Sequence, residues 1–256
     1  MIGFSTTAAV LAALIALSAG LSAGPALAQA DAGQTSQHRT NLLDLKLGTP
    51  AKDLPEEAFI DYACGTMGGP PSVPIGGFTD YAKCPAEKSG LHEVEFRYDD
   101  ELEYRLLARG DTSDAETNGG TKVSAYPAIV SALFDDKGIL RGLRAVTDTR
   151  IDLRDRSMSY MMADAVRNMY GMDGWNCTNH PPAQGEEPIS GNYINQTCSK
   201  TTEGELIYTE AHLFRRAGET EINRDTGRTE HGSFESSARI EIREAGAPVD
   251  DKGRPL

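Results

Sequence analysis

The chain has 256 residues and a formal net charge of −13, from 38 acidic and 25 basic side chains. This acid excess disfavours nucleic acids and anionic lipid surfaces as partners, because both require basic patches. It suits a soluble protein, and it leaves open a cationic partner or metal ions. The length allows one large domain or two small ones.

The composition of residues 1–30 predicts a secretory signal peptide. These residues carry no ionisable side chain, and an apolar run over 8–19 precedes small residues and candidate cleavage sites near Ala28 or Ala30. An uncleaved anchor is the alternative, but glycine and proline interrupt the run before the roughly 20 apolar residues of a spanning helix. We expect a periplasmic or secreted protein without a stable membrane anchor, in which 31–40 is a linker.

The first element expected after the linker is a short helix. Thr49 is a good N-cap residue, and Pro50 suits the first helical position. Pro55 then shortens or breaks the helix.

Strands are expected after Cys84. Apolar side chains at 94, 96 and 98 alternate with Glu93, Glu95 and Arg97, which is typical of an antiparallel strand with one face in water. Residues 128–146 predict a hairpin in which Gly138 takes the position with positive φ.

The glycine-rich segment CGTMGGPPSVPIGGFTDYAKC, over 64–84, allows two interpretations. Eight of the nineteen residues between its cysteines are Gly or Pro. A phosphate-binding loop needs its glycines between a strand and a helix N-terminus, usually with a lysine nearby. Here the glycines follow the expected helix, so we interpret the segment as a disulfide-closed piece of scaffold.

A similar pattern recurs later in the chain. Residues 74–90 and 188–204 match in five of seventeen positions at a constant offset of 114, where about one match is expected from ordinary usage. We interpret the match as a tandem duplication. Four cysteines in an exported chain then predict the disulfides Cys64–Cys84 and Cys177–Cys198, since a zinc site or redox pair would favour C-x-x-C spacing.

The second half repeats the order of the first. A methionine-rich helix is expected over 158–172, with Met161 in the core, and alternation over 234–243 predicts a strand. The predicted fold class is therefore α+β: two tandem units, over 41–150 and 151–243, each with a helix packed on three or four antiparallel strands. Residues 244–256 are expected to form a flexible tail.

Motifs for catalysis are missing from the sequence. It contains no G-x-S-x-G, no H-E-x-x-H and no closely spaced histidine pair. We therefore assign no catalytic residue and no cofactor, and leave a metal open. The helix over 158–172 could bind Cu(I) through thioethers but better suits core packing. The acidic loop over 111–120 partly resembles a calcium loop, although a mobile hairpin tip explains it better.

Two long polar loops, over 108–122 and 215–232, are the expected binding surface. Loops of this length in compact domains are usually functional or disordered. If these loops are not the site, the strand face with Glu93, Glu95 and Arg97, or that of the 234–243 strand, is the next candidate. The candidate binding residues are Asp111, Asp114, Glu116, Asn118, Glu221, Arg224, Asp225 and Arg228.

The predicted layout resembles the exported β-lactamase-inhibitor-protein family, which has two tandem α+β units. The segment LKLGTPAKDLP, over 45–55, also resembles the start of small outer-membrane assembly lipoproteins, although this chain lacks their lipidation cysteine and has longer repeats. The resemblance implies a protein-binding role without catalysis.

Three hypotheses follow from the sequence. The first is an exported, non-catalytic binding, accessory or inhibitor protein with a protein partner, which could be cationic. The second is a periplasmic protein that binds a metal or small molecule through the acidic loop or the methionine-rich helix. The third is a hydrolase.

Overall fold

The computed structural model describes residues 40–223, 225–232 and 234–256, so the predicted signal peptide and nearly all of the linker lie outside the described residues. Most of the regular structure is strand. The strands are β1 (Phe59–Cys64), β2 (His92–Tyr98), β3 (Lys122–Val123), β4 (Tyr126–Phe134), β5 (Leu140–Thr147), β6 (Asn176–Asn179), β7 (Glu186–Glu187), β8 (Ile194–Thr201), β9 (Glu205–Arg216), β10 (Thr220–Ile222), β11 (Thr229–His231) and β12 (Phe234–Glu244).

The helices are few and short. They are α1 (Glu101–Ala108), α2 (Thr112–Asn118) and α3 (Met161–Met169), with the 3-10 turns η1 (Leu42–Asp44), η2 (Ala51–Asp53), η3 (Glu56–Ala58) and η4 (Phe78–Lys83). Within the described part of the chain, no helix is long and apolar enough to cross a membrane.

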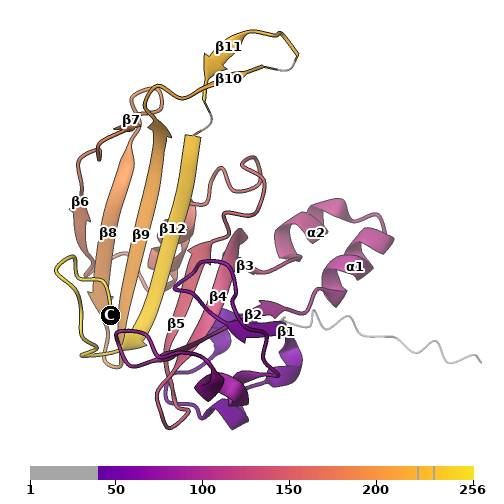
Figure 1. Ribbon diagram of the computed structural model, residues 1–256, viewed down its shortest axis with the longest axis vertical. Coiled ribbons are helices and arrows are strands. Elements are labelled where there is room, and N and C mark those ends of the chain that lie inside the picture. Colours follow the sequence, from indigo (N-terminus) through magenta and orange to yellow (C-terminus); the bar gives the residue numbers. More distant parts are fainter. Residues whose placement is uncertain (1–39, 224, 233) are drawn as a thin grey trace, which may run out of the picture. The chain divides into compact units, whose positions relative to one another are not determined.

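Ten strands form one antiparallel sheet in the order β1-β2-β4-β5-β12-β9-β8-β6, with β3 and β7 paired to β4 and β9 (Figure 1). Each half of the chain supplies four main strands, which run in sequence order from an outer edge to the centre. The halves meet where β5 pairs with β12, from Val146↔Arg239 to Gly142↔Arg243. Strands β10 and β11 form a separate hairpin.

The predicted fold class is wrong. The chain does not form two tandem α+β units with a helix on each sheet, because the pairing of β5 with β12 makes one sheet of both halves. The helix expected from Thr49 is replaced by η2 and η3, followed by β1. Prolines at 50 and 55 limit each helical segment there to a single turn.

Two other local predictions, a hairpin and a helix, are confirmed, whereas the expected burial of Met161 is not. Strands β4 and β5 form the expected hairpin, in which Gly138 has a φ of +73°. Helix α3 forms within 158–172, but its buried face consists of Met162, Ala163 and Val166. Met161 is only partly buried, so its expected place in the core is taken by Met162, which is fully buried.

One face of the sheet holds the apolar core. In the second half, α3 packs on β9 and β12. In the first half, Phe78 of η4 lies edge-on to Tyr62 and Phe96, with ring centroids 5.0 and 5.1 Å apart. Such aromatic pairs contribute about 0.5–1.5 kcal/mol each beyond the area that they bury.

Both predicted disulfides are present. Cys64–Cys84 closes a loop of the first half, and Cys177–Cys198 links β6 to β8, with Cα atoms 5.1 and 4.1 Å apart. The pairing therefore follows the spacing in the sequence, although the two-unit fold does not.

The opposite face, which we call the polar face, is exposed at Arg97 of β2 as the alternation predicts, but not at Glu93 and Glu95. Glu93 is 2% exposed, and Glu95 is 4% exposed. The glycine-rich segment covers part of this face: a Cβ at Gly65 would lie 2.3 Å from Cδ of Glu93, and one at Gly68 would lie 2.3 Å from Cγ2 of Val146. The glycines thus let a scaffold loop lie directly on the sheet.

Candidate functional site

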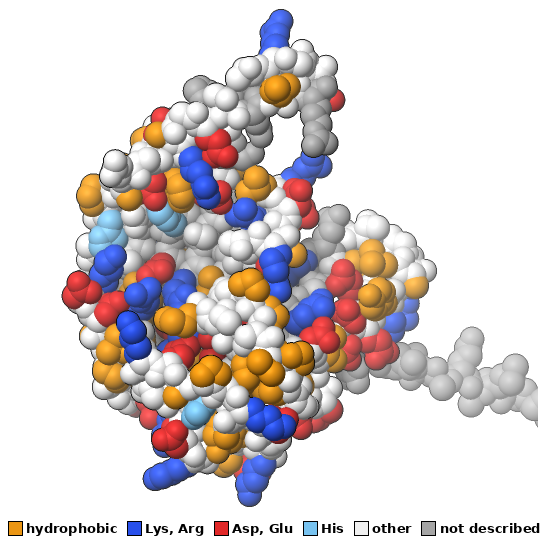
Figure 2. All heavy atoms as spheres, in the orientation of Figure 1, with side chains coloured by type: hydrophobic (Ala, Val, Ile, Leu, Met, Phe, Trp, Pro, Cys, Tyr) orange, Lys and Arg blue, Asp and Glu red, His pale blue; other side chains and the backbone are white. Residues whose placement is uncertain are grey.

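Two cavities lie on the polar face. One of about 600 Å³ lies between α1, α2 and the strands β2 and β4, and the other, of about 360 Å³, lies over β8 and β9. Figure 2 shows acidic, basic and apolar side chains interspersed over the visible surface, without one dominant charge. A ligand would therefore be selected by the groups inside a cavity rather than by a single-signed surface.

The larger cavity, which we call the Glu95 cavity, has the sheet as its floor. Glu95 and Arg97 project from β2 beside Ile129 of β4, as the alternation of the two strands requires. Leu107 of α1 and Ala115 of α2 form an apolar wall. The cavity therefore combines an apolar wall with charged groups on its floor.

The opposite wall comes from the connection between β5 and α3. Arg150 there donates hydrogen bonds from Nε and Nη2 to both carboxylate oxygens of Asp148, at 2.8 and 2.9 Å. Although burial raises the pKa of Asp148, these bonds to Arg150 lower it overall. The pair is therefore charged and mutually satisfied.

Glu95 is not satisfied in this way. No group among the described residues donates a hydrogen bond to its buried Oε2. Burial raises the pKa of Glu95 to about 7, against the lowering effect of Arg150, and the charges of Glu93 and Asp148 raise it further. The cavity thus contains a buried carboxyl group that titrates near neutral pH and has one oxygen without a hydrogen bond from the described residues.

A network of buried charges adjoins Glu95 on the polar face. Arg144 is 1% exposed and contacts Glu87, Glu93 and Glu241 at 2.5, 2.9 and 2.7 Å. Glu241 also contacts Arg239 at 2.7 Å and Arg243 at 3.0 Å. The network pairs three arginines with three glutamates, so its charges are largely compensated, although Oε1 of Glu93 and the guanidinium nitrogens of Arg243 form no hydrogen bond with the described residues.

The smaller cavity has fewer unsatisfied groups. Nε2 of His180 lies 3.0 Å from Oγ1 of Thr197, and Nε2 of His212 lies 3.2 Å from Oε2 of Glu186. The hydroxyl of Tyr208 donates to Glu210 at 2.7 Å. Its histidines and carboxylate therefore already have partners within the chain.

No family model, curated protein or solved structure matches this chain. The resemblance of residues 45–55 to outer-membrane assembly lipoproteins and that of the predicted layout to the inhibitor-protein family stay predictions.

The predicted binding residues lie in two separate segments of the chain, and their role in binding stays a prediction. The loop over 108–122 is largely helical, and Asp111 caps α2 by accepting a hydrogen bond from the backbone N–H of Asp114. Asp225 and Arg228 lie in the exposed turn between β10 and β11. Arg224 lies outside the described residues, and nothing is described of the side chains of Glu116, Asn118 and Glu221.

Both loops leave the same end of the sheet, but they are different connections. The first joins β2 to β4, and the second joins β9 to β12. The first loop does contribute to the Glu95 cavity, through Ala115 and residues 119–122. Within the described residues, no group of three or more His, Cys, Asp or Glu side chains could hold a metal ion.

Sequence reasoning nearly missed the central residue of the site. Glu95 was a candidate only as part of a water-facing strand, to be considered if the loops failed. The alternation correctly places it on the polar face beside Arg97. Its burial depends on α1, α2 and the 148–155 segment, which reach it from elsewhere in the chain.

Proposed function

We propose that the protein is an exported, non-catalytic binding protein that holds a small organic molecule with an ammonium group in the Glu95 cavity. The observation that supports this function is the buried carboxyl group of Glu95 on the floor of a cavity of about 600 Å³, with an Oε2 to which no described group donates a hydrogen bond. Binding sites for small molecules typically combine apolar walls with a few placed polar groups.

An ammonium group is the chemistry that best completes the site. It supplies both a hydrogen-bond donor and a positive charge, so Glu95 ionises when the ligand binds. Leu107, Ala115 and Ile129 offer apolar contacts to the body of the ligand. The net charge of −13 also favours the approach of a cation.

The test is a thermal-shift titration of the oxidised protein at pH 7.5 with hexylamine, hexanol and hexanoate. These probes share a chain and differ in the head group. Hexylamine should give a saturable rise in Tm of roughly 5–10 °C at a hundredfold excess over its Kd, because it binds the native state alone. Hexanol and hexanoate should give little shift.

Two variants separate the site from nonspecific effects. Glu95→Gln should abolish the hexylamine shift, whereas Glu210→Gln, in the smaller cavity, should retain it. Equal shifts with the three probes, or an undiminished hexylamine shift in Glu95→Gln, would contradict the proposal.

A protein partner is the second candidate function. It is favoured by the β10–β11 hairpin, which lies outside the ten-stranded sheet and carries Ile222 with 69% of its surface exposed. Within the described residues its two strands pair only with each other, so the open edge of the hairpin suits a strand of a partner. Loss of a captured partner when this hairpin is removed would favour this function.

A further inference from the structure

The disulfide Cys177–Cys198 lies at an outer edge of the sheet. Among the described strands, β6 pairs only with β8, and Cys177 stands directly opposite Cys198 in that pairing. All four residues of β6 are exposed, including Cys177, whereas Cys198 is only 1% exposed. Cys177 is therefore the more accessible half of this bond.

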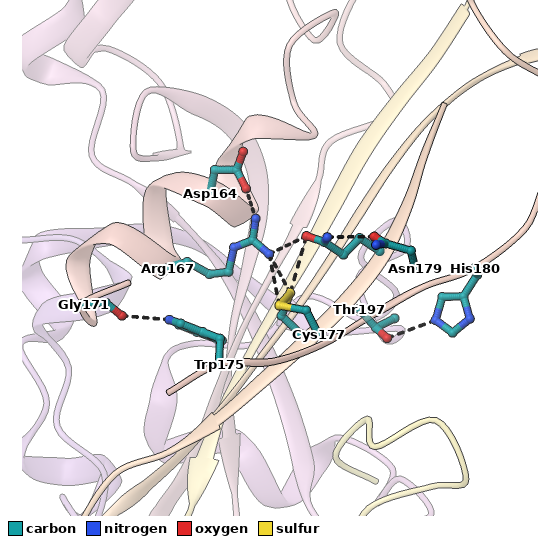
Figure 3. Close-up of a disulfide and its surroundings, with 10 residues drawn as sticks. Asp164, Arg167, Gly171, Trp175, Cys177, Asn179, His180 and Thr197 are labelled. Carbon is teal, nitrogen blue, oxygen red and sulfur yellow. Dashed lines mark hydrogen bonds and ion pairs between the residues drawn. A yellow bond between two sulfur atoms is a disulfide. The ribbon is translucent and has the colours of Figure 1, made fainter. Parts of the chain in front are cut away.

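A basic side chain is aimed at the same bond. Figure 3 shows Arg167 reaching from α3 to the disulfide. Its Nη1 lies 3.6 Å from Sγ of Cys177 and closer still to Sγ of Cys198. Asp164 and the side-chain oxygen of Gln196 also accept hydrogen bonds from the guanidinium, which fixes its orientation.

This arrangement favours one direction of attack. A cation beside a cysteine lowers the pKa of its thiol and stabilises the thiolate. A stabilised thiolate is a better leaving group, and a stabilised reduced form makes the disulfide more oxidising. The external thiolate thus attacks the sulfur of Cys177, the exposed residue. The thiolate of Cys198, which lies beside Arg167, is the leaving group.

The other disulfide has a different environment. Cys64 and Cys84 are 0% and 3% exposed and belong to the hydrophobic core. Buried disulfides without access for a thiolate resist exchange. The buried disulfide Cys64–Cys84 can therefore serve as a control for the accessible disulfide Cys177–Cys198 in the same protein.

We propose that Cys177–Cys198 is a site of thiol–disulfide exchange with an external dithiol, and that Cys64–Cys84 stays oxidised under the same conditions. This inference is independent of the Glu95 cavity. It assigns chemistry to a bond that the sequence alone presents only as a structural crosslink.

The exchange takes place in two balanced steps. A thiolate of the dithiol attacks Sγ of Cys177, forms a mixed disulfide and expels Cys198 as a thiolate. The second thiol of the dithiol then loses its proton and attacks the dithiol sulfur that is bonded to Cys177. This attack expels Cys177 as a thiolate. The dithiol becomes a disulfide, and Cys177 takes up the proton.

Reduction would loosen the edge of the sheet. Strand β6 would then be held to β8 by backbone hydrogen bonds along a four-residue pairing. His180, which follows β6 and lines the smaller cavity, would lose the crosslink that holds it beside Thr197. The redox state of this bond is thereby linked to the shape of the smaller cavity.

The experiment is a dithiothreitol titration of the native, full-length folded chain. Free thiols are blocked with iodoacetamide at each point and mapped by mass spectrometry. Cys177 and Cys198 should be alkylated at dithiothreitol concentrations that leave Cys64 and Cys84 bonded. Labelling of both pairs together, or of Cys64 and Cys84 first, would overturn the proposal.

The role of Arg167 is tested by its own variant. In the Arg167→Gln variant, dithiothreitol should reduce Cys177–Cys198 roughly three- to tenfold more slowly than in the wild type, because the leaving thiolate of Cys198 is less stabilised. Arg216→Gln, in an exposed ion pair on β9, is the matched control and should keep the wild-type rate. An unchanged rate in a folded Arg167→Gln protein would refute the role of Arg167. If that variant does not fold, the order of labelling in the wild-type protein still decides the proposal.

Discussion

The two halves of the sheet each contain four main strands and one disulfide, but different segments of the chain cover the two halves. In the first half, aromatic side chains cover one face, while the loop closed by Cys64–Cys84 covers part of the other. In the second half, α3 covers the apolar face, while the polar side chains of β8 remain largely half-exposed. The same alternating pattern thus gives buried charges on β2, β5 and β12 and a more solvated surface on β8.

The largest expected effect is in the buried ionic network. Arg144→Leu leaves Glu87 and Glu93 without the arginine that each contacts, so we expect a loss of about 3–5 kcal/mol in the free energy of unfolding. Urea denaturation measures it. Arg216→Leu, which breaks an exposed pair with Glu235, should change stability by less than about 1 kcal/mol. Equal losses in the two variants would show that burial does not set this network apart from an exposed ion pair.

A second comparison concerns α3. Met162 is fully buried, whereas Met169 on the same helix is 62% exposed. Met162→Ala should lower stability by about 2–5 kcal/mol because it leaves a cavity in the core. Met169→Ala should change it by less than about 0.5 kcal/mol. Similar thermal denaturation midpoints for the two variants would contradict the packing of α3 on β9 and β12.

Local patterns predicted the strands better than their surroundings. Strand β1 was missed because a bulge between Ile60 and Ala63 breaks its alternation, with Asp61 at a φ of +54°. Strand β2 was predicted, but a pattern within one strand cannot show that a distant loop covers Glu93. The pairing of β5 with β12 joins residues almost a hundred positions apart, and nothing local in either strand specifies it.

The Glu95 cavity was predictable only in part, for the same reason. The side of the sheet on which Glu95 lies follows from period-two alternation. Its missing hydrogen-bond partner depends on how α1, α2 and the 148–155 segment pack. Both disulfide pairings were predictable because the cysteine spacing recurs, whereas the contact with Arg167 depends on the docking of α3.

A smaller effect is expected from Glu95→Gln, and it depends on pH. The pKa of Glu95 in the folded protein is about 7, above the ordinary value of 4.5. Glu95 therefore stabilises the fold fully when the pH is below 4.5, its ordinary pKa. This stabilisation is lost as the pH rises to about 7. The variant should be more stable than the wild type by about 1–3 kcal/mol at pH 8 and similar to it at pH 4.

Urea midpoints from pH 4 to 8 measure this difference. Burial also raises the pKa of Glu93, so part of the pH dependence should remain in the variant. A constant difference between the two proteins across this range would contradict the assignment of the titration to Glu95.

The smallest effect concerns the two loops predicted to bind. Replacing residues 217–233 with an Asn-Gly turn removes the β10–β11 hairpin and should change stability by less than about 1 kcal/mol, since loop length has a weak effect. The hexylamine shift should be unaffected. Shortening 100–120 in the same way removes α1 and α2 and should abolish that shift. Retention of the shift after the second change would place the ligand elsewhere.

The central structural claim is that both halves of the chain form one sheet joined at β5 and β12. Native-state amide hydrogen exchange, read by mass spectrometry on the oxidised protein, tests it most directly. We expect β4, β5, β12 and β9 to exchange last and at the same denaturant-dependent rate, as one cooperative unit, and β6 to exchange early. Separate exchange of β4–β5 and β9–β12 as two units of different stability would contradict the single sheet.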